Sequence, residues 1–72
     1  MSEMQKPYVD FKGEKMSVTT LLNCFEDFAR LCRDCSVAVK NVEHRLTAAQ
    51  KAQLRRIKIY LKEALEILEM II

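Results

Sequence analysis

Apolar residues along most of the chain recur at alternating spacings of three and four positions. Such spacing puts the apolar side chains on one stripe of an α-helix, and it is the heptad period of helices packed along a left-handed seam. The pattern therefore predicts two amphipathic helices. The first run comprises Val18, Leu21, Phe25, Phe28, Cys32, Cys35, Val39, Val42 and Leu46, and the second comprises Leu54, Ile57, Leu61, Ala64, Leu68 and Ile71.

Each run is preceded by a helix-start signal. Ser17 is a suitable N-cap for the first helix, and Met16 and Leu21 stand at the positions of a hydrophobic staple. Thr47, followed by Gln50 three residues later, has the spacing of a capping box. These signals predict that one helix begins at Ser17 and that another begins just after Thr47.

The phase of the apolar pattern breaks between the two runs. Continuing the first register beyond Leu46 places polar residues on the seam, so we expect a connection here. The expected elements are a helix at 17–43, a loop at 44–47 and a helix at 48–71, folded as an antiparallel hairpin. A single long bent helix is the alternative, because no Gly or Pro lies in this connection.

Residues 1–16 are expected to form an N-terminal arm that is extended or partly disordered. The chain's one Pro and one Gly, Pro7 and Gly13, both fall within this segment. Between them lies an apolar cluster around Tyr8 and Phe11, followed by a turn signal at 12–14. The cluster is a candidate short strand or a peptide that docks on the helices, and a frayed terminus is the alternative. The helical hairpin would then occupy 17–72.

The apolar surface of the two helices is wider than one seam can cover. Ile59, Tyr60, Ile67 and Met70 lie outside the heptad positions of the second run. A chain of this size gains only about 3–5 kcal/mol from its own core. The expected fold class is therefore all-α, with hairpins pairing into a homodimeric four-helix bundle, and burial on a different protein is the alternative. The residues expected in this seam and dimer core are Leu21, Phe25, Phe28, Cys32, Cys35, Val39, Leu54, Ile57, Leu61, Leu65, Leu68 and Ile71.

The order of charges supports self-association. In the second run the bases come first, from Lys51 to Lys62, and the acids follow, from Glu63 to Glu69. This order opposes the helix macrodipole, so local helix energetics do not explain it. Two antiparallel copies would bring each basic end beside the other's acidic end.

The Cys32-Arg33-Asp34-Cys35 stretch resembles a metal or redox motif. Redox pairs lie at a helix N-terminus or beside cations, whereas these two cysteines fall deep inside the first run. Zinc needs four ligands, and the remaining candidates, Cys24 and His44, are separated by about 30 Å along one helix. The interpretation is that Cys32 and Cys35 pack in the seam, with no metal and no cofactor; a site shared between two chains is the alternative.

Composition narrows the classes of function. Three cysteines and the lack of a secretory leader favour a cytoplasmic protein, and no apolar run is long enough to span a membrane. Neither a phosphate-binding glycine loop nor a Ser-His-Asp set occurs, so we expect neither an enzyme nor a small-molecule substrate. The formal net charge of +2 does not by itself indicate nucleic acid.

These observations favour a non-enzymatic interaction protein. It would bind itself and modulate a larger intracellular protein, as an inhibitor, adaptor or chaperone. In outline it is similar to the small helical hairpins among secretion chaperones and phage-encoded inhibitors, a resemblance that implies fold more than function. The alternative is a small DNA- or RNA-binding regulator that uses the basic start of the second helix, and a more distant one is a cysteine-based sensor. The candidate partner-binding residues are Tyr8, Phe11, Arg45, Lys51, Arg55 and Arg56.

Overall fold

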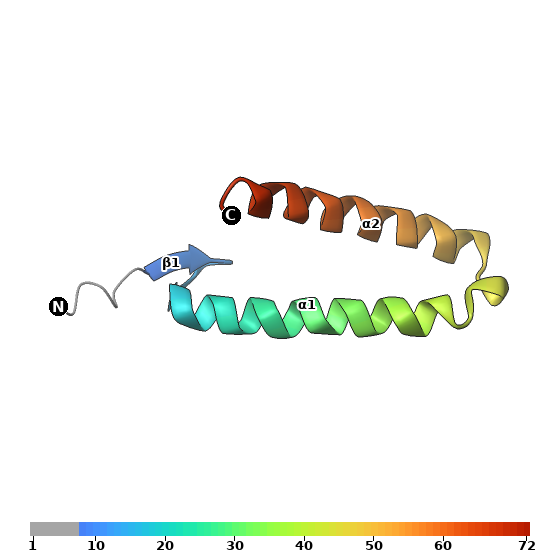
Figure 1. Ribbon diagram of the computed structural model, residues 1–72, viewed down its shortest axis with the longest axis horizontal. Helices are drawn as coiled ribbons and strands as arrows, with labels where there is room; N and C mark the ends of the chain where they lie inside the picture. The colour runs from blue at the N-terminus through green and yellow to red at the C-terminus, as the bar shows by residue number, and fades with distance from the viewer. Residues whose placement is uncertain (1–7) are drawn as a thin grey trace. The chain divides into compact units, whose positions relative to one another are not determined.

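The computed structural model describes residues 8–72, which are mostly helical (Figure 1). In chain order the elements are strands β1 (Tyr8–Phe11) and β2 (Glu14–Ser17), helix α1 (Val18–Lys40), a 3₁₀ turn and helix α2 (Ala48–Glu69). Two long helices joined by a short connection confirm the predicted order of helical elements. The chain divides into two compact units, Met1–Asn41 and Val42–Ile72.

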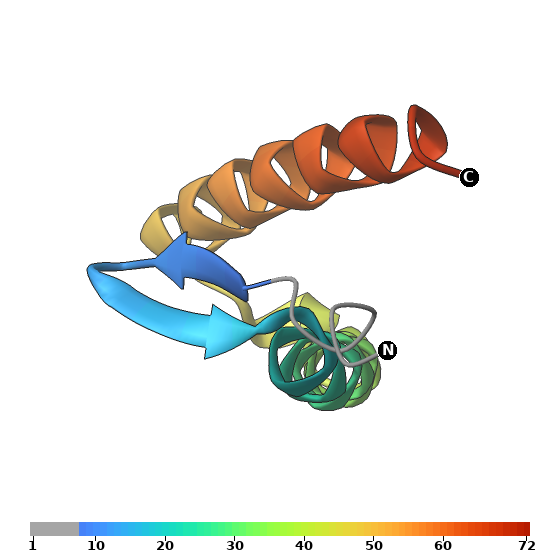
Figure 2. The same cartoon turned by 90° about the vertical axis from the view of Figure 1, so that its left-hand side faces the viewer.

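The N-terminal unit opens with a β-hairpin instead of a single extended arm. Strands β1 and β2 are antiparallel, as Figure 2 shows, and Val9 pairs with Met16. The connecting residues Lys12 and Gly13 have φ angles of 57° and 86°. Positive φ at both positions of a two-residue loop gives the turn twist that matches paired strands. The chain is mostly helical, as the all-α prediction has it, and the β-hairpin is an addition at the position that the turn signal at 12–14 had marked.

Helix α1 begins where the sequence predicted. The Ser17 hydroxyl accepts a hydrogen bond of 3.1 Å from the backbone N–H of Thr20, which confirms the N-cap. Because Ser17 is also the last residue of β2, the hairpin leads into the helix without a loop. The direct connection from β2 into α1 therefore holds the β-hairpin at the start of the helix.

Helix α1 ends at Lys40, three residues before the end of the expected range 17–43. Val42 leaves the helical conformation, with φ −119° and ψ 21°, and Glu43–Arg45 then form the 3₁₀ turn. Tightening into a 3₁₀ turn is a common way to satisfy carbonyls at a helix end. Leu46 is extended, so the alternative of one continuous bent helix is wrong.

Helix α2 starts with the predicted capping box. The Thr47 hydroxyl accepts from the Gln50 N–H at 3.1 Å, and the Thr47 N–H donates to the Gln50 side chain at 2.9 Å. At the other end, the N–H groups of Ile71 and Ile72 both donate to the Leu68 carbonyl. Helix α2 therefore ends at Glu69, two residues before the end of the expected range 48–71, and backbone hydrogen bonds continue from it to Ile72.

Residues 8–72 of a single chain contain no buried side chain. Leu21, Cys32 and Val39 in α1 and Leu54 and Leu68 in α2 are partly buried. The large apolar side chains that remain exposed include Phe25, Phe28, Leu31, Ile57, Ile59, Tyr60, Leu61, Leu65, Ile67 and Ile71. The seam and the dimer stay predictions, since they need contacts beyond either unit taken by itself. In the part of the chain that is described, no helix is long and apolar enough to cross a membrane.

Candidate interaction surfaces

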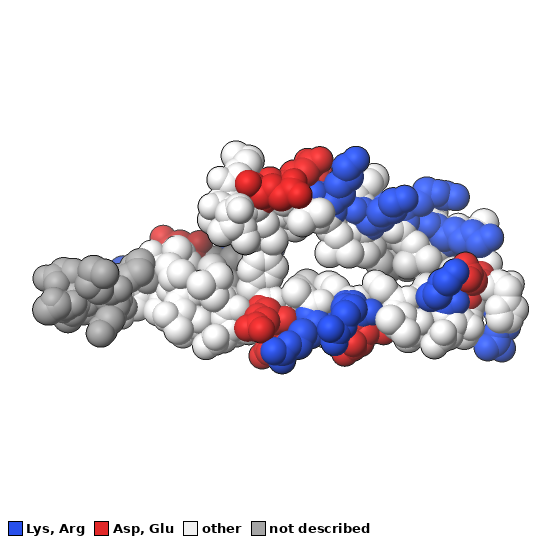
Figure 3. All heavy atoms as spheres, in the orientation of Figure 1, with Lys and Arg blue, Asp and Glu red and all other residues white. Residues whose placement is uncertain are grey.

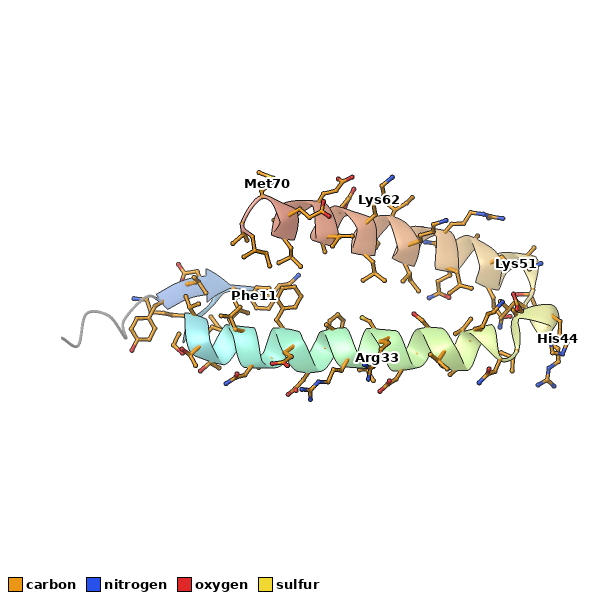
Figure 4. The ribbon with its side chains drawn as sticks, in the orientation of Figure 1. Phe11, Arg33, His44, Lys51, Lys62 and Met70 are labelled. Carbon is orange, nitrogen blue, oxygen red and sulfur yellow. The ribbon has the colours of Figure 1, made fainter. Side chains whose placement is uncertain are left out.

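An apolar groove lies in the N-terminal unit, between β1 and the first half of α1. Its volume is about 610 Å³, and it is lined by Phe11, Leu21, Cys24, Phe25 and Phe28. Phe11 comes from β1 and projects over the first turns of α1 (Figure 4). The helical residues share one face because they are spaced by three, four and seven positions. We call this set the aromatic groove.

The aromatic groove is open and its rings are accessible. Phe25 is 40% exposed, Phe11 46% and Phe28 60%. The Lys12 ammonium lies 5.9 Å from the centre of the Phe11 ring, at the outer limit of a cation–π contact. Exposed aromatic side chains in a concave apolar surface are typical anchors for another protein. The groove can therefore bind apolar side chains, since its lining side chains apart from the Cys24 thiol are hydrocarbon.

The two aromatic candidates of the N-terminal arm, Tyr8 and Phe11, do not lie on the same surface. Successive side chains of a strand point to opposite faces, so Tyr8 and Phe11, three residues apart, lie on opposite faces of β1. Phe11 lines the aromatic groove, while Tyr8 is exposed outside its lining. Partner binding by each of these residues stays a prediction.

The basic candidates lie in the C-terminal unit. Arg45 belongs to the 3₁₀ turn, and Lys51, Arg55 and Arg56 follow on the first half of α2. Figure 3 shows basic side chains along this part of α2 and acidic side chains toward its end. Lys51, Arg55, Lys58 and Lys62 are spaced by four, three and four, so they form one stripe along the helix. The predicted basic surface is therefore continued by two lysines that the candidate set did not include.

The charges of α1 are arranged differently. Arg30 pairs with Glu26 at 3.1 Å, one helical turn away, and Arg33 pairs with its neighbour Asp34 at 3.5 Å. All four side chains are well exposed, so each pair adds little to stability. These pairs neutralise the charge of α1 locally.

The cysteines of α1 are free thiols. Cys24 and Cys35 are exposed, and Cys32 is partly buried. The Cys32 carbonyl accepts a hydrogen bond of 2.8 Å from the Ser36 hydroxyl. Across residues 8–72, no three His, Cys, Asp or Glu side chains are close enough together to hold a metal ion. Packing of Cys32 and Cys35 in a seam stays a prediction.

Sequence reasoning missed the aromatic groove, although it had flagged every ring that lines it. Phe25 and Phe28 were assigned to the seam, and Phe11 to a separate arm. The sequence signal at this point was the Lys12-Gly13 turn, which by itself did not show that the segments on either side of it pair. Folding the arm back at that turn brings Phe11 to α1.

Comparisons of the chain with protein-family models, with curated proteins and with solved structures find no match. Its function is therefore inferred from the residues and surfaces described above.

Proposed function

We propose that this chain is a non-enzymatic protein–protein interaction module that binds and modulates a larger protein. One observation carries the proposal: two helices of 23 and 22 residues carry large apolar side chains at heptad spacing, and none is buried among residues 8–72. Burying a Leu, Ile or Phe side chain contributes about 1.5–3 kcal/mol. Assembly with another chain is how such surfaces are removed from water.

Self-association is the first step of this function. A two-fold homodimer in which each copy supplies two amphipathic helices forms a four-helix bundle, whose centre buries residues from all four helices. The breadth of the apolar surface supports this assembly, because Ile59, Tyr60 and Ile67 of α2 are exposed beside its heptad positions. A small chain also gains stability from oligomerisation that its own core does not supply.

The aromatic groove supports a second contact, with the modulated protein. Its concave apolar lining suits a short apolar segment, as in the docking of a helix or an extended peptide. Tyr8, on the opposite face of β1, and the basic residues of the C-terminal unit are separate candidate contacts with the modulated protein. These basic residues are Arg45, Lys51, Arg55 and Arg56. The apolar lining of the groove supports a role in modulation through protein contact.

Concentration-dependent unfolding tests the proposal. Mass action makes the melting temperature of an assembled protein rise with its concentration. When the chain is concentrated by about a hundredfold, we expect the helical circular-dichroism signal to melt several degrees higher. A hundredfold excess of a binding partner over its dissociation constant stabilises the folded state by about 2.7 kcal/mol. A cooperative melt whose midpoint does not change over that range would contradict the proposal.

A nucleic-acid regulator is the second candidate. The observation favouring it is the stripe of Lys51, Arg55, Lys58 and Lys62, which their spacing places on one side of α2. Phosphate contacts of this kind make affinity fall steeply with salt. A salt-sensitive gel shift with generic duplex DNA that is lost in the double variant Arg55→Ala, Arg56→Ala would favour this function over the interaction module.

A further inference from the structure

The charged side chains of α2 find no partner among the described residues 8–72. Among residues 8–72, none of these side chains takes part in an ion pair. The first turn of α2 holds no acid and the last turn holds no base, so the charges also oppose the helix macrodipole. Within the basic stripe, like charges one turn apart repel each other. The charged residues are Lys51, Arg55, Arg56, Lys58, Lys62, Glu63, Glu66 and Glu69.

The sign of the charge reverses at one point of α2, between Lys62 and Glu63. Every charged residue of the helix before this midpoint is basic and every one after it is acidic. Arg56 precedes the midpoint by as many residues as Glu69 follows it. The charge pattern of α2 is therefore antisymmetric about a single position.

The apolar heptad positions are symmetric about the same midpoint. Leu61 and Ala64 are equally distant from it along the sequence, and the same holds for Ile57 with Leu68 and for Leu54 with Ile71. Two independent patterns, one apolar and one charged, thus share one centre. In α1 acids and bases are interspersed, with Arg30 and Arg33 between Asp27 and Asp34, so α1 has no such centre of charge reversal.

A two-fold axis at this midpoint satisfies both patterns together. In a two-fold interface, when residue i contacts residue j of the second copy, j contacts i. Antiparallel α2 helices centred there place Leu61 opposite Ala64, Ile57 opposite Leu68, and Leu54 opposite Ile71 of the second copy. Glu69 of one copy comes level with residues 55–58 of the other, where Arg55 and Lys58 share its side of the seam.

We propose that the face of α2 defined by Leu54, Ile57, Leu61, Ala64, Leu68 and Ile71 docks on the same face of a second copy, antiparallel and centred between Lys62 and Glu63. This rests on the proposed function in that it names the first partner of the interaction module. Charge complementarity selects the occupant: a second copy presents acids where the first presents bases. Ile57 and Leu61 are 43% and 42% exposed in one chain, and this contact covers them.

Two complementary charge variants of the full chain test the proposal. The acid-swap variant carries Glu63→Lys, Glu66→Lys and Glu69→Lys; the base-swap variant carries Arg55→Glu, Lys58→Glu and Lys62→Glu. The acid-swap variant leaves only basic charges in α2. The base-swap variant leaves six glutamates against two bases, Lys51 and Arg56, so in each variant antiparallel copies present mostly like charges and repel. By sedimentation velocity, we expect the dissociation constant of self-association to rise at least about tenfold in each variant. An equimolar mixture of the two should regain assembly as a mixed pair.

A matched control separates this pairing from net charge alone. The control variant carries Glu14→Lys, Asp27→Lys and Asp34→Lys. Each change raises the wild-type net charge of +2 by two units, so the control has a formal net charge of +8, the same as the acid-swap variant. We expect it to self-associate like the wild type and not to rescue the base-swap variant. Added salt should weaken wild-type assembly and strengthen that of each swap variant, because screening reduces attraction and repulsion alike.

The outcomes distinguish this proposal from the proposed function. If the wild type assembles and the swap variants assemble equally well, or if their mixture shows no mixed pair, the α2 pairing is wrong while the interaction module stands. If the wild type is a monomer throughout, the self-association on which both rest is contradicted.

Discussion

Individual residues determine where the elements of this chain begin. Ser17 and Thr47 were identifiable from sequence because capping depends on side chains within three residues, and both form the expected hydrogen bonds. Lys12 and Gly13 were identifiable as a turn, but not as the turn of a hairpin. That distinction depends on the pairing of the flanking segments, and Glu14 and Lys15 gave no apolar alternation to indicate a second strand.

Substituting Gly13 with alanine should unfold the β-hairpin selectively. Gly13 has φ 86°, which costs an L-residue roughly 1–2 kcal/mol, while an added Cβ meets no atom within 4 Å. The expected result of Gly13→Ala is loss of the cross-strand NMR contacts between Val9 and Met16, with the helices retained. Lys12→Asn is the matched control, because asparagine tolerates positive φ. Intact cross-strand contacts in Gly13→Ala would show that the turn does not limit the hairpin.

Removing the Thr47 hydroxyl should weaken α2. The capping box satisfies two backbone groups, and its loss costs about 1 kcal/mol. We expect Thr47→Ala to lower the free energy of unfolding in urea by about that amount, and Thr47→Ser to restore it. Equal stability of the two variants would mean that the hydroxyl contributes nothing.

At the scale of elements, the helices were predictable from the sequence, whereas the segments that contact them were not. Heptad spacing reports the apolar stripe of each helix, so α1 and α2 follow from the sequence. The aromatic groove was not predictable, because Phe11 reaches α1 only after the chain turns at Gly13. The early end of α1 was also missed, because neither Gly nor Pro stands near Val42. The helix gives way there to a 3₁₀ turn.

Phe11 should contribute more to the stability of the N-terminal unit than Tyr8 does. Phe11 lines the aromatic groove with α1 and Tyr8 does not, although the two are similarly exposed. We expect Phe11→Ala to increase hydrogen exchange in the first turns of α1, through loss of roughly 1 kcal/mol of apolar burial for a half-exposed ring. Tyr8→Ala is the control. Equal exchange in the two variants would show that Phe11 does not stabilise α1 through the aromatic groove.

Cysteine cross-linking should report the register of the α2 pair. In a background with Cys24, Cys32 and Cys35 changed to serine, Leu54→Cys and Ile71→Cys are placed in separate chains. The proposed antiparallel register puts these two thiols opposite each other. Oxidation of the mixture should therefore yield the Leu54→Cys–Ile71→Cys pair in excess over either self-pair. A predominance of the Leu54→Cys self-pair would indicate parallel helices instead.

At the scale of the whole molecule, local patterns specify the helices but not the contacts that bury them. The sequence predicted a mostly helical chain, and the structure adds the β-hairpin and the aromatic groove. Which surfaces meet depends on the apolar area buried between distant segments of one chain and between chains. A short stretch of sequence does not reveal this area. The midpoint of α2 is the proposed exception, because a two-fold contact there would leave its symmetry in the sequence of one helix.

The mass of the wild-type chain in solution at micromolar concentration tests the central claim most directly. Sedimentation equilibrium should give twice the chain mass of 8.4 kDa, with dissociation on dilution accompanied by loss of helical signal. A particle of one chain mass that keeps its helices and unfolds cooperatively would contradict the claim that the exposed apolar faces exist to bind another chain.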